Sequence, residues 1–599
     1  MFGKILYISD SMAYVQNLAG SNVQADLMNM HVIFESNGER ILGEITEVNS
    51  SEIKIRFLGE YQGNRFLNGV LRKPLLSSTI RIINGEELMA LVGTYSENSF
   101  VLGQSAIYKN FTVCPSINDL FSNHLAIFGN TGSGKSCGVS RMVQNIFLNK
   151  FAKVKNANMF IFDAYGEYKN AFSSINTIDP EYNYKFITTN PKEATDVPLK
   201  IPVNLLKLDD YALLLQASKH TQLPILERTL KLSKIFATDS PESRKYKNHL
   251  IAKALLAVLF SSETTAQKKN EIFTIIETCH TPEFNFDTTI QGLGYTRSFS
   301  ECFEIDSNGY FGESVLITEY ILKNINDEIE NIAPDENAFY SLLDFSKALE
   351  FTLISEGFLH NDTLVDDASI LKVRLTTILH SEVGNYFDGT KHYTNTEFID
   401  ALKSFNGKKA QIININLEDV DDIYAKVIVK IMCKFLFDYS KSLEQRASIP
   451  FHLFLEEAHR YIQKDNDTFL LGYNIFDRIA KEGRKYGVTL LLSSQRPSEI
   501  SETIFSQCNN FIAMRLTNPN DQNYVKKLLP DVMGGMIDKI QSLQAGEALI
   551  IGDSIVVPSL VKIEECINKP SSVDIPYFDL WKEKWKNIDF KKLEKEWHK

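Results

Sequence analysis

Residues 129–136 read Gly-Asn-Thr-Gly-Ser-Gly-Lys-Ser and fit the G-x-x-x-x-G-K-[ST] pattern of a phosphate-binding loop. Glycines let successive backbone N–H groups turn toward phosphate oxygens at the positive end of the next helix. Lys135 would reach the outer phosphates, and the Ser136 hydroxyl would hold Mg²⁺. An apolar run at 124–128 predicts a buried parallel strand, and helical spacing of apolar residues predicts a helix over 136–149. This context argues against a chance Gly/Ser loop and predicts binding of a nucleoside triphosphate.

A phosphate loop needs a carboxylate at the end of a neighbouring apolar strand, and residues 451–459 supply one. Glu456 would face the metal, directly or through water, as in a Walker B motif. Glu457 would orient or deprotonate the attacking water. The alternative is a solvated helix start, where a Glu pair ending an apolar strand would be unusual.

Asp163 ends the apolar strand that follows the phosphate loop. It could bind the metal directly or from the second shell, with Glu167 bracing it. The alternative is an Asp that caps the next turn, a common role of Asp in turns.

Three further polar residues have spacings suited to a nucleotide site. Arg484 lies at a predicted helix end and could neutralise transition-state charge, whereas Lys485 reads as a solvated charge. Gln495 lies at a strand tip and could sense the third phosphate. Arg515 is a second sensor candidate, with a structural ion pair equally plausible. The predicted nucleotide contacts are Gly129, Asn130, Thr131, Gly132, Ser133, Gly134, Lys135, Ser136, Cys137 and Arg515.

Bulk composition limits the class of protein. A chain of 599 residues is too long for one core, and 44% hydrophobic with 23% charged residues is ordinary for a soluble globular protein. No run reaches the roughly 18 apolar residues of a membrane span, and the N-terminus lacks signal-peptide features. Seven cysteines without paired metal spacing predict free thiols in a reducing cytoplasm. The net charge of −12 argues against a protein coated in nucleic acid but allows a narrow basic channel.

The elements that must position these residues fall into five predicted regions. Short alternating runs separated by turn residues predict an N-terminal antiparallel β-barrel over 1–110. From 123 onward, apolar strands alternate with helices, as in a doubly wound α/β sheet. The first part of this core is predicted at 111–204 and the second at 391–555. Leu-, Lys- and Glu-rich stretches predict a helical insertion over 205–390, and a charged tail is predicted over 556–599.

Taken together, these motifs resemble the HerA family within the FtsK–HerA branch of P-loop ATPases. The residues that carry the resemblance are the phosphate loop, Asp163-x-x-Gly166-Glu167-Tyr168, Glu456-Glu457-Ala458-His459, Glu482-Gly-Arg484-Lys485-Tyr486-Gly487 and Gln495-Arg496-Pro497. Their order and spacing span nearly the whole chain. The chain departs from the family in two respects: Ala164-Tyr165 replaces the common Pro-His, and the helical insertion is long, which prevents any transfer of pore-loop residues.

The resemblance implies a RecA-like ATPase core with an N-terminal HAS-barrel-like domain, ATP and Mg²⁺ as cofactors, and a homohexameric ring. ATP would lie between subunits, Arg484 would act on the neighbour's nucleotide, and double-stranded DNA would pass through the centre. The implied partners are a nuclease or, in bacterial anti-phage defence, a sirtuin-like NAD-consuming effector docked on the β-barrel. No membrane partner is expected.

Three functional hypotheses follow. The first is a DNA translocase that works with a partner nuclease or effector in defence or DNA end processing. The second is an ATP-binding ring scaffold that switches a partner without moving DNA, which the acidic net charge keeps open. The third, a secretion- or conjugation-type coupling ATPase, would need a membrane anchor that the sequence does not show.

Overall fold

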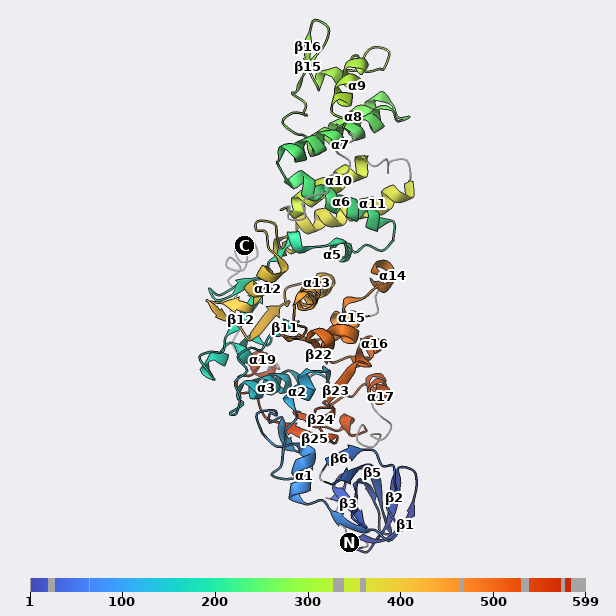
Figure 1. The fold of residues 1–599 in the computed structure, drawn as a ribbon, viewed down its shortest axis with the longest axis vertical. Coiled ribbons are helices and arrows are strands. Elements are labelled where there is room, and N and C mark those ends of the chain that lie inside the picture. The colour runs from blue at the N-terminus through green and yellow to red at the C-terminus, as the bar shows by residue number, and fades with distance from the viewer. Residues whose placement is uncertain are drawn as a thin grey trace.

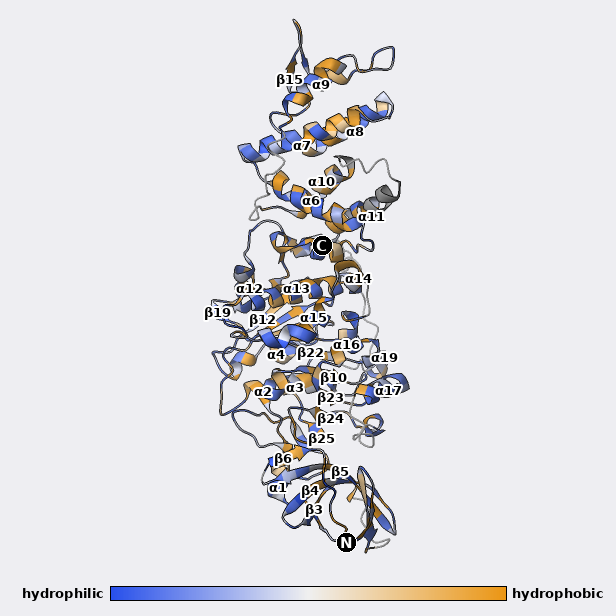
Figure 2. Cartoon of the chain, turned by 45° about the vertical axis from the view of Figure 1, so that its right-hand side comes forward, coloured by the Kyte–Doolittle hydropathy of each residue, from blue (hydrophilic) through white to orange (hydrophobic). Residues whose placement is uncertain are grey.

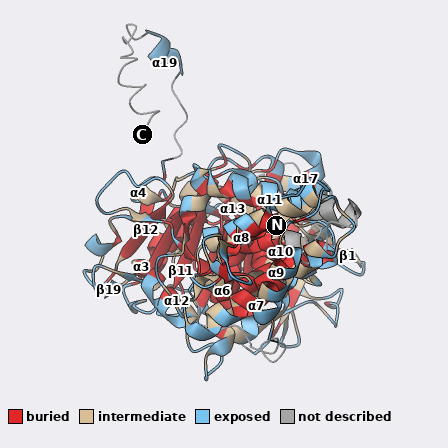
Figure 3. Ribbon diagram, turned by 90° about the horizontal axis from the view of Figure 1, so that it is seen from above, coloured by how far each residue is buried: buried red, intermediate tan, exposed pale blue. Residues whose placement is uncertain are grey.

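The computed structural model describes residues 2–19, 27–63, 65–326, 339–355, 362–463, 467–528, 538–571 and 577–582. The molecule is elongated, with an N-terminal sheet at one end, a large sheet in the middle and a stack of helices at the other end (Figure 1). Viewed along the long axis, buried residues occupy the centre and exposed residues the outside (Figure 3). No helix within the described ranges combines the length and apolarity that crossing a membrane requires.

The N-terminal sheet is antiparallel, as its alternating sequence pattern predicts. Its strands follow the order β1-β2-β5-β4-β3-β7, with β6 paired to β5, so β1 and β7 form open edges in the described part of the sheet. Its seven strands are β1 (Phe2–Ile8), β2 (Met12–Asn17), β3 (His31–Ser36), β4 (Glu39–Val48), β5 (Glu52–Gln62), β6 (Arg65–Asn68) and β7 (Thr79–Ile82). Closure into a barrel stays a prediction.

The central sheet has twelve strands in the order β13-β12-β20-β11-β21-β22-β10-β23-β24-β25-β8-β9. From β13 to β23 every pair is parallel, and from β23 to β9 every pair is antiparallel. The parallel strands are β10 (His124–Phe128), β11 (Met159–Asp163), β12 (Tyr184–Thr188), β13 (Val197–Pro198), β20 (Ile412–Asn416), β21 (Phe451–Leu455), β22 (Val488–Ser494) and β23 (Cys508–Ala513). The antiparallel strands are β24 (Glu547–Gly552), β25 (Ser559–Ile563), β8 (Gly103–Ser105) and β9 (Thr112–Val113).

The predicted α/β fold is confirmed, but two predicted boundaries cut through the central sheet. β8 lies within the 1–110 range predicted for the N-terminal barrel, and β25 lies within the 556–599 range predicted for the tail. Both pair with each other at the antiparallel end of the sheet. A strand of three residues such as β8 gives almost no periodic signal, so the pattern of the sequence does not assign it to a sheet.

Helices cover both faces of the central sheet because successive strand residues point to opposite sides. Phe160 and Phe162 of β11 pack in one apolar cluster together with α13 (Asp422–Ser442) and α15 (Ile475–Glu482). Met159 and Ile161 of the same strand pack in a second cluster with α3. The helices of this second layer are α1 (Gly85–Val92), α2 (Ile117–Phe121), α3 (Lys135–Phe147) and α4 (Lys169–Phe172). The strands read as continuous apolar runs because both faces are covered.

The helices that follow β14 (Ile201–Pro202) stack beyond α13 (Figure 1). Helices α7 and α8 carry both hydrophilic and hydrophobic residues (Figure 2), and the hydrophobic ones form an apolar cluster of their own. The stack consists of α5 (Leu208–Leu214), α6 (Gln222–Ala237), α7 (Pro241–Leu259), α8 (Thr265–Cys279), α9 (Ser314–Lys323), α10 (Leu342–Ser355) and α11 (Asp362–Leu379). Two small strands, β15 (Thr289–Gln291) and β16 (Thr296–Ser298), lie at its far end (Figure 1).

The chain returns from the stack to the sheet through β17 (Phe387–Asp388), which pairs with β14. A buried ion pair also joins the stack to the core, since Lys434 of α13 donates to Asp210 of α5 at 2.9 Å. The remaining elements are α12 (Asn395–Lys403), β18 (Ser404–Phe405), β19 (Lys408–Lys409), α14 (Asp467–Leu471), α16 (Glu502–Phe505), α17 (Pro519–Leu528) and α19 (Tyr577–Lys582). Residues of α19 are exposed, and the helix stands apart from the body in Figure 3.

Candidate nucleotide site

The phosphate loop connects the end of β10 to the start of α3. Gly132 and Gly134 have φ of 73° and 88°, a region that side chains rarely adopt. A Cβ at Gly134 would also lie 3.0 Å from the backbone nitrogen of Gly546. Two backbone hydrogen bonds join the loop to its surroundings. Asn130 N donates to the Arg515 carbonyl at 3.0 Å, and Gly546 N donates to the Ser133 carbonyl at 2.9 Å. The glycine pattern therefore serves both the backbone turn and its close packing.

The two glutamates after β21 lie beside the loop, although more than 300 residues separate them from it in the sequence. Glu457 Oε1 accepts a hydrogen bond from Lys135 Nζ at 2.6 Å, and the two side chains are only 3% and 5% exposed. Glu457 has a φ of 45°, which is strained for a residue with a side chain. Such strain is typical of functional sites that their surroundings hold in place.

Gln495 at the end of β22 links Glu457 to the phosphate loop. Its Nε2 donates to Glu457 Oε1 at 2.8 Å, and its Oε1 accepts from Thr131 Oγ1 at 2.6 Å. His459 Nδ1 lies 3.3 Å from Glu457 Oε2. Burial raises the pKa of Glu457, but Lys135 and Gln495 outweigh burial and hold that pKa below its ordinary value. Glu457 is therefore a carboxylate at neutral pH.

Glu456 is a different kind of acid. It is 1% exposed, and its Oε2 accepts from the backbone nitrogen of Ala164 at 3.3 Å. Burial, followed by the nearby charge of Asp163, raises the pKa of Glu456 well above its ordinary value. The pKa values of the two adjacent acids thus shift in opposite directions, because only Glu457 hydrogen-bonds directly to Lys135.

Asp163 lies at the end of β11, within the same group of acids. Its Oδ1 accepts from Glu167 N at 3.0 Å, and its Oδ2 accepts from Tyr168 N at 2.9 Å and from Asn414 Nδ2 at 3.1 Å. This is the turn-capping geometry that the sequence left open as an alternative to metal binding. No sequence motif indicated that Asn414, on β20, would reach this group.

Two cavities flank these residues. The smaller, of 520 Å³, is lined by Asn130 and Thr131 of the phosphate loop together with Gln495 and Arg515. Arg515 Nη2 also donates to the Gly132 carbonyl at 3.4 Å. The structure therefore places Arg515 over the phosphate loop, which is consistent with the sensor prediction.

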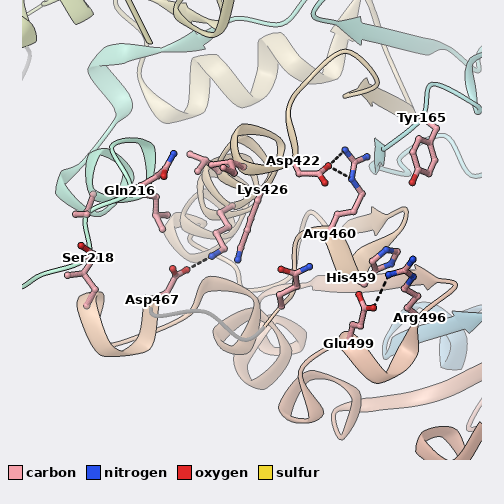
Figure 4. Close-up of a pocket in the computed structure, with 18 residues that line it drawn as sticks. Tyr165, Gln216, Ser218, Asp422, Lys426, His459, Arg460, Asp467, Arg496 and Glu499 are labelled. Carbon is pink, nitrogen blue, oxygen red and sulfur yellow. Dashed lines mark hydrogen bonds and ion pairs between the residues drawn. The ribbon is translucent and has the colours of Figure 1, made fainter. Parts of the chain in front are cut away.

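The larger cavity, of 820 Å³, opens beyond the ends of β11 and β21 (Figure 4). Six of its charged side chains form three pairs: Arg460 Nε with Asp422 at 2.8 Å, Arg496 Nη1 with Glu499 at 3.0 Å, and Lys430 with Asp467. Tyr165, one of the two residues that depart from the family motif, lies over the Arg460 guanidinium. The cavity adjoins the acidic residues but contains no part of the phosphate loop.

Arg484 does not join this site in its own chain. It is exposed in the turn Gly483–Tyr486, which precedes β22, whereas the phosphate loop follows the carboxyl end of β10. Burial lowers the pKa of His124, the first residue of β10, and the charge of Arg484 adds to this effect, so Arg484 lies near the amino edge of the sheet. Because β10 and β22 are neighbouring parallel strands, Arg484 and its own phosphate loop lie at opposite ends of these strands.

Cys137, predicted to contact nucleotide, is joined by a disulfide to Cys566. This corrects the prediction that all seven cysteines are free thiols, and the other five are free. The two residues lie 429 positions apart, so no sequence spacing could reveal the pair. Near the disulfide, Arg141 of α3 pairs with Glu564 at 3.2 Å, so the segment after β25 packs along the helix of the phosphate loop.

A parallel α/β sheet with a phosphate loop after β10 and a buried acidic pair after β21 defines a P-loop ATPase. Residues 100–286 match the family model described as "Helicase HerA, central domain". The predicted resemblance of the chain to the HerA family is confirmed by this match and by two curated relatives. Both relatives are named DNA double-strand break repair helicase HerA.

The relative from Sulfurisphaera tokodaii is 24% identical over 522 residues, which cover 86% of this chain and 79% of that protein. The relative from Pyrococcus furiosus is 24% identical over 546 residues, which cover 91% and 82%. Among solved structures, the plasmid coupling protein TrwB with a non-hydrolysable GTP analogue is similar with a TM-score of 0.43 and 14% identity. That match covers 82% of this chain and 95% of TrwB.

Proposed function

We propose that this protein is an ATP-driven motor that binds and translocates double-stranded DNA as a homohexameric ring with a partner nuclease or effector enzyme. The observation that carries the proposal is the chain of contacts Thr131–Gln495–Glu457–Lys135, which joins the phosphate loop, the acidic pair and the end of β22. A motor needs such a link because a change in the bound phosphates must alter the contacts of the elements that move. The names of the HerA relatives support DNA as the substrate.

In this proposal, Lys135 leaves Glu457 when the phosphates of ATP enter the loop, and it pairs with them instead. Glu457 then turns to the attacking water as general base, while Gln495 reports on the third phosphate through Thr131. Bound Mg²⁺ would neutralise phosphate charge, and the residues that fit it are the Ser136 hydroxyl and the neighbouring carboxylates. Arg515 lies where it can contact the outer phosphates.

DNA dependence of the ATPase tests the function directly. We expect linear double-stranded DNA to accelerate ATP hydrolysis several-fold, and the same DNA to lose a bound streptavidin roadblock when ATP is supplied. The Lys135→Ala protein serves as the inactive control. An ATPase that ignores DNA and displaces nothing contradicts the translocase and leaves the ring scaffold, which would switch its partner without moving DNA.

Arg484 is proposed to act on the nucleotide of the neighbouring subunit, because its exposed position lies away from its own phosphate loop. Arg484→Ala should slow ATP hydrolysis by about 10³-fold or more, the usual effect of removing an arginine finger. Mixed with Lys135→Ala subunits, it should recover activity. In a head-to-tail ring mixed at random in equal amounts, about a quarter of the sites have both an intact loop and an intact arginine.

Lys485→Ala is the matched control, since Lys485 is an exposed cation in the same turn. It should hydrolyse ATP at the normal rate. Absence of recovery at every mixing ratio, with mixed rings verified by mass spectrometry, would show that Arg484 does not act between subunits.

A further inference from the structure

The loop after β11 carries a second acid toward the phosphate loop. This loop, residues 164–168, turns back at Gly166, which has a φ of 70°. A Cβ at Gly166 would lie 2.6 Å from Glu418 Oε2 and 3.2 Å from Asn416 Oδ1, so the turn is tightly enclosed. Asp163 holds the end of the turn through the backbone nitrogens of Glu167 and Tyr168. The backbone of Glu167 is therefore held in place by the hydrogen bond that its nitrogen donates to Asp163.

The oxygens of Asp163 and Glu167 are used in opposite ways. Three N–H groups donate hydrogen bonds to the carboxylate of Asp163, so both of its oxygens already accept hydrogen bonds from the protein. Oε2 of Glu167 is buried and has no hydrogen-bond partner in the described part of the chain. A buried carboxylate oxygen without a partner is costly, and in native structures it commonly marks an absent ligand or ion.

Two more observations place this oxygen of Glu167 beside the phosphate loop. Burial raises the pKa of Glu167, and hydrogen bonding by Ser136 partly offsets this, so the Ser136 side chain adjoins the carboxyl. The Tyr168 hydroxyl is fully buried, lacks a hydrogen-bond partner within the described residues, and lies near Ser136 and Glu456. The carboxyl of Glu167 and the hydroxyl of Tyr168 thus both lie near the Ser136 hydroxyl, which the sequence assigns to Mg²⁺. Hard oxygen donors are the ligands that Mg²⁺ prefers.

We infer that Glu167 is the carboxylate that faces the Mg²⁺ of the nucleotide next to Ser136, either directly or through one of its waters. Asp163 is then a positioning residue that holds the 164–168 turn. This reverses the roles that the sequence suggested, in which Asp163 bound the metal and Glu167 braced it. The inference rests on the proposed ATPase function and assigns the metal-facing acid within it.

Metal binding, measured without turnover, tests this assignment. Mn²⁺ replaces Mg²⁺ as the probe, and electron paramagnetic resonance measures its affinity for the full-length protein saturated with a non-hydrolysable ATP analogue. Glu167→Gln should weaken Mn²⁺ binding by about 10-fold or more, by analogy with the loss of groups that support metal ligands. Binding of a fluorescent ATP analogue in EDTA should be unchanged, because no metal takes part. Glu167→Asp, which keeps the charge, should recover part of the Mn²⁺ affinity.

Glu418→Gln is the matched control, since Glu418 is an exposed acid beside Gly166 in the same region. It should bind Mn²⁺ like the unchanged protein. Normal Mn²⁺ affinity in Glu167→Gln, together with a lower unfolding temperature, would overturn the inference and make Glu167 a structural brace. If the unchanged protein itself showed no nucleotide-dependent Mn²⁺ binding, the proposed ATPase site would fail, which is a distinct result.

Discussion

Glu457→Gln should stop ATP hydrolysis and at the same time tighten ATP binding. Loss of a general base costs about 10²- to 10⁴-fold in rate. The gain in affinity has a separate cause, because the Glu457 carboxylate lies 2.6 Å from Lys135 Nζ and competes with phosphate for it. A glutamine leaves the buried ammonium without a counter-charge, which is unfavourable until phosphate arrives. We expect roughly 10-fold tighter binding, about 1.4 kcal/mol, as the part of this penalty that ATP relieves.

Both effects can be measured on the same protein, hydrolysis by phosphate release and affinity by fluorescence of a labelled ATP. Glu499→Gln is the control, because Glu499 is an acid that lines the larger cavity and not the smaller one beside the phosphate loop. It should alter neither quantity strongly. Weaker ATP binding by Glu457→Gln would contradict the competition between glutamate and phosphate, and retained hydrolysis would exclude Glu457 as the base.

Lys135→Ala should strongly weaken ATP binding and also destabilise the nucleotide-free protein. The first effect removes a cation from the phosphates and should weaken binding by about 10²-fold or more. The second follows because Glu457 would remain buried without its cation, a loss of about 3–5 kcal/mol for a broken buried pair. Burial is the largest influence on the pKa of Glu457, so without Lys135 that pKa should rise above its unfolded value.

The contribution of Glu457 to the pH dependence of stability should therefore have opposite signs in the unchanged protein and in Lys135→Ala. In the unchanged protein the pKa of Glu457 is depressed, so its contribution is present above the unfolded pKa and is lost as the pH falls through the folded pKa. In Lys135→Ala the pKa is raised, so stability is lost as the pH rises through it. Thermal unfolding without nucleotide should show a deficit that grows as the pH rises above the unfolded pKa of a glutamate, about 4.3. The double variant Lys135→Ala/Glu457→Gln should regain stability, and a deficit independent of pH would contradict this account.

Local sequence was enough to predict the parts of the site that are built by neighbouring residues. The phosphate loop is a continuous stretch of eight residues whose glycines and lysine act within one turn of backbone. Glu456 and Glu457 directly follow β21, which the apolar run at 452–455 predicts. Strands at 159–162, 411–416 and 488–492 were predicted in the same way, because burial on both faces requires continuous apolar runs.

Contacts between distant segments were beyond reach, because periodicity records which face of an element is buried and not which element covers it. The order of the strands places β20 between β12 and β11, although more than 200 residues separate β20 from either in the sequence. Only that order brings Asn414 to Asp163, where its side chain donates a hydrogen bond to a carboxylate oxygen that had suggested a metal ligand. Strands β8 and β9 were missed because three-residue and two-residue strands carry almost no pattern.

The sequence by itself determined that this protein has a nucleotide-binding loop, an acidic pair and a doubly wound α/β fold, since each depends on local spacing and on burial. The tertiary structure decided which charge meets which: Lys135 with Glu457, Cys137 with Cys566, and Arg484 away from its own phosphate loop. The physical reason is that electrostatic and covalent pairing depends on distance in space, and distance is set only when the whole sheet has formed.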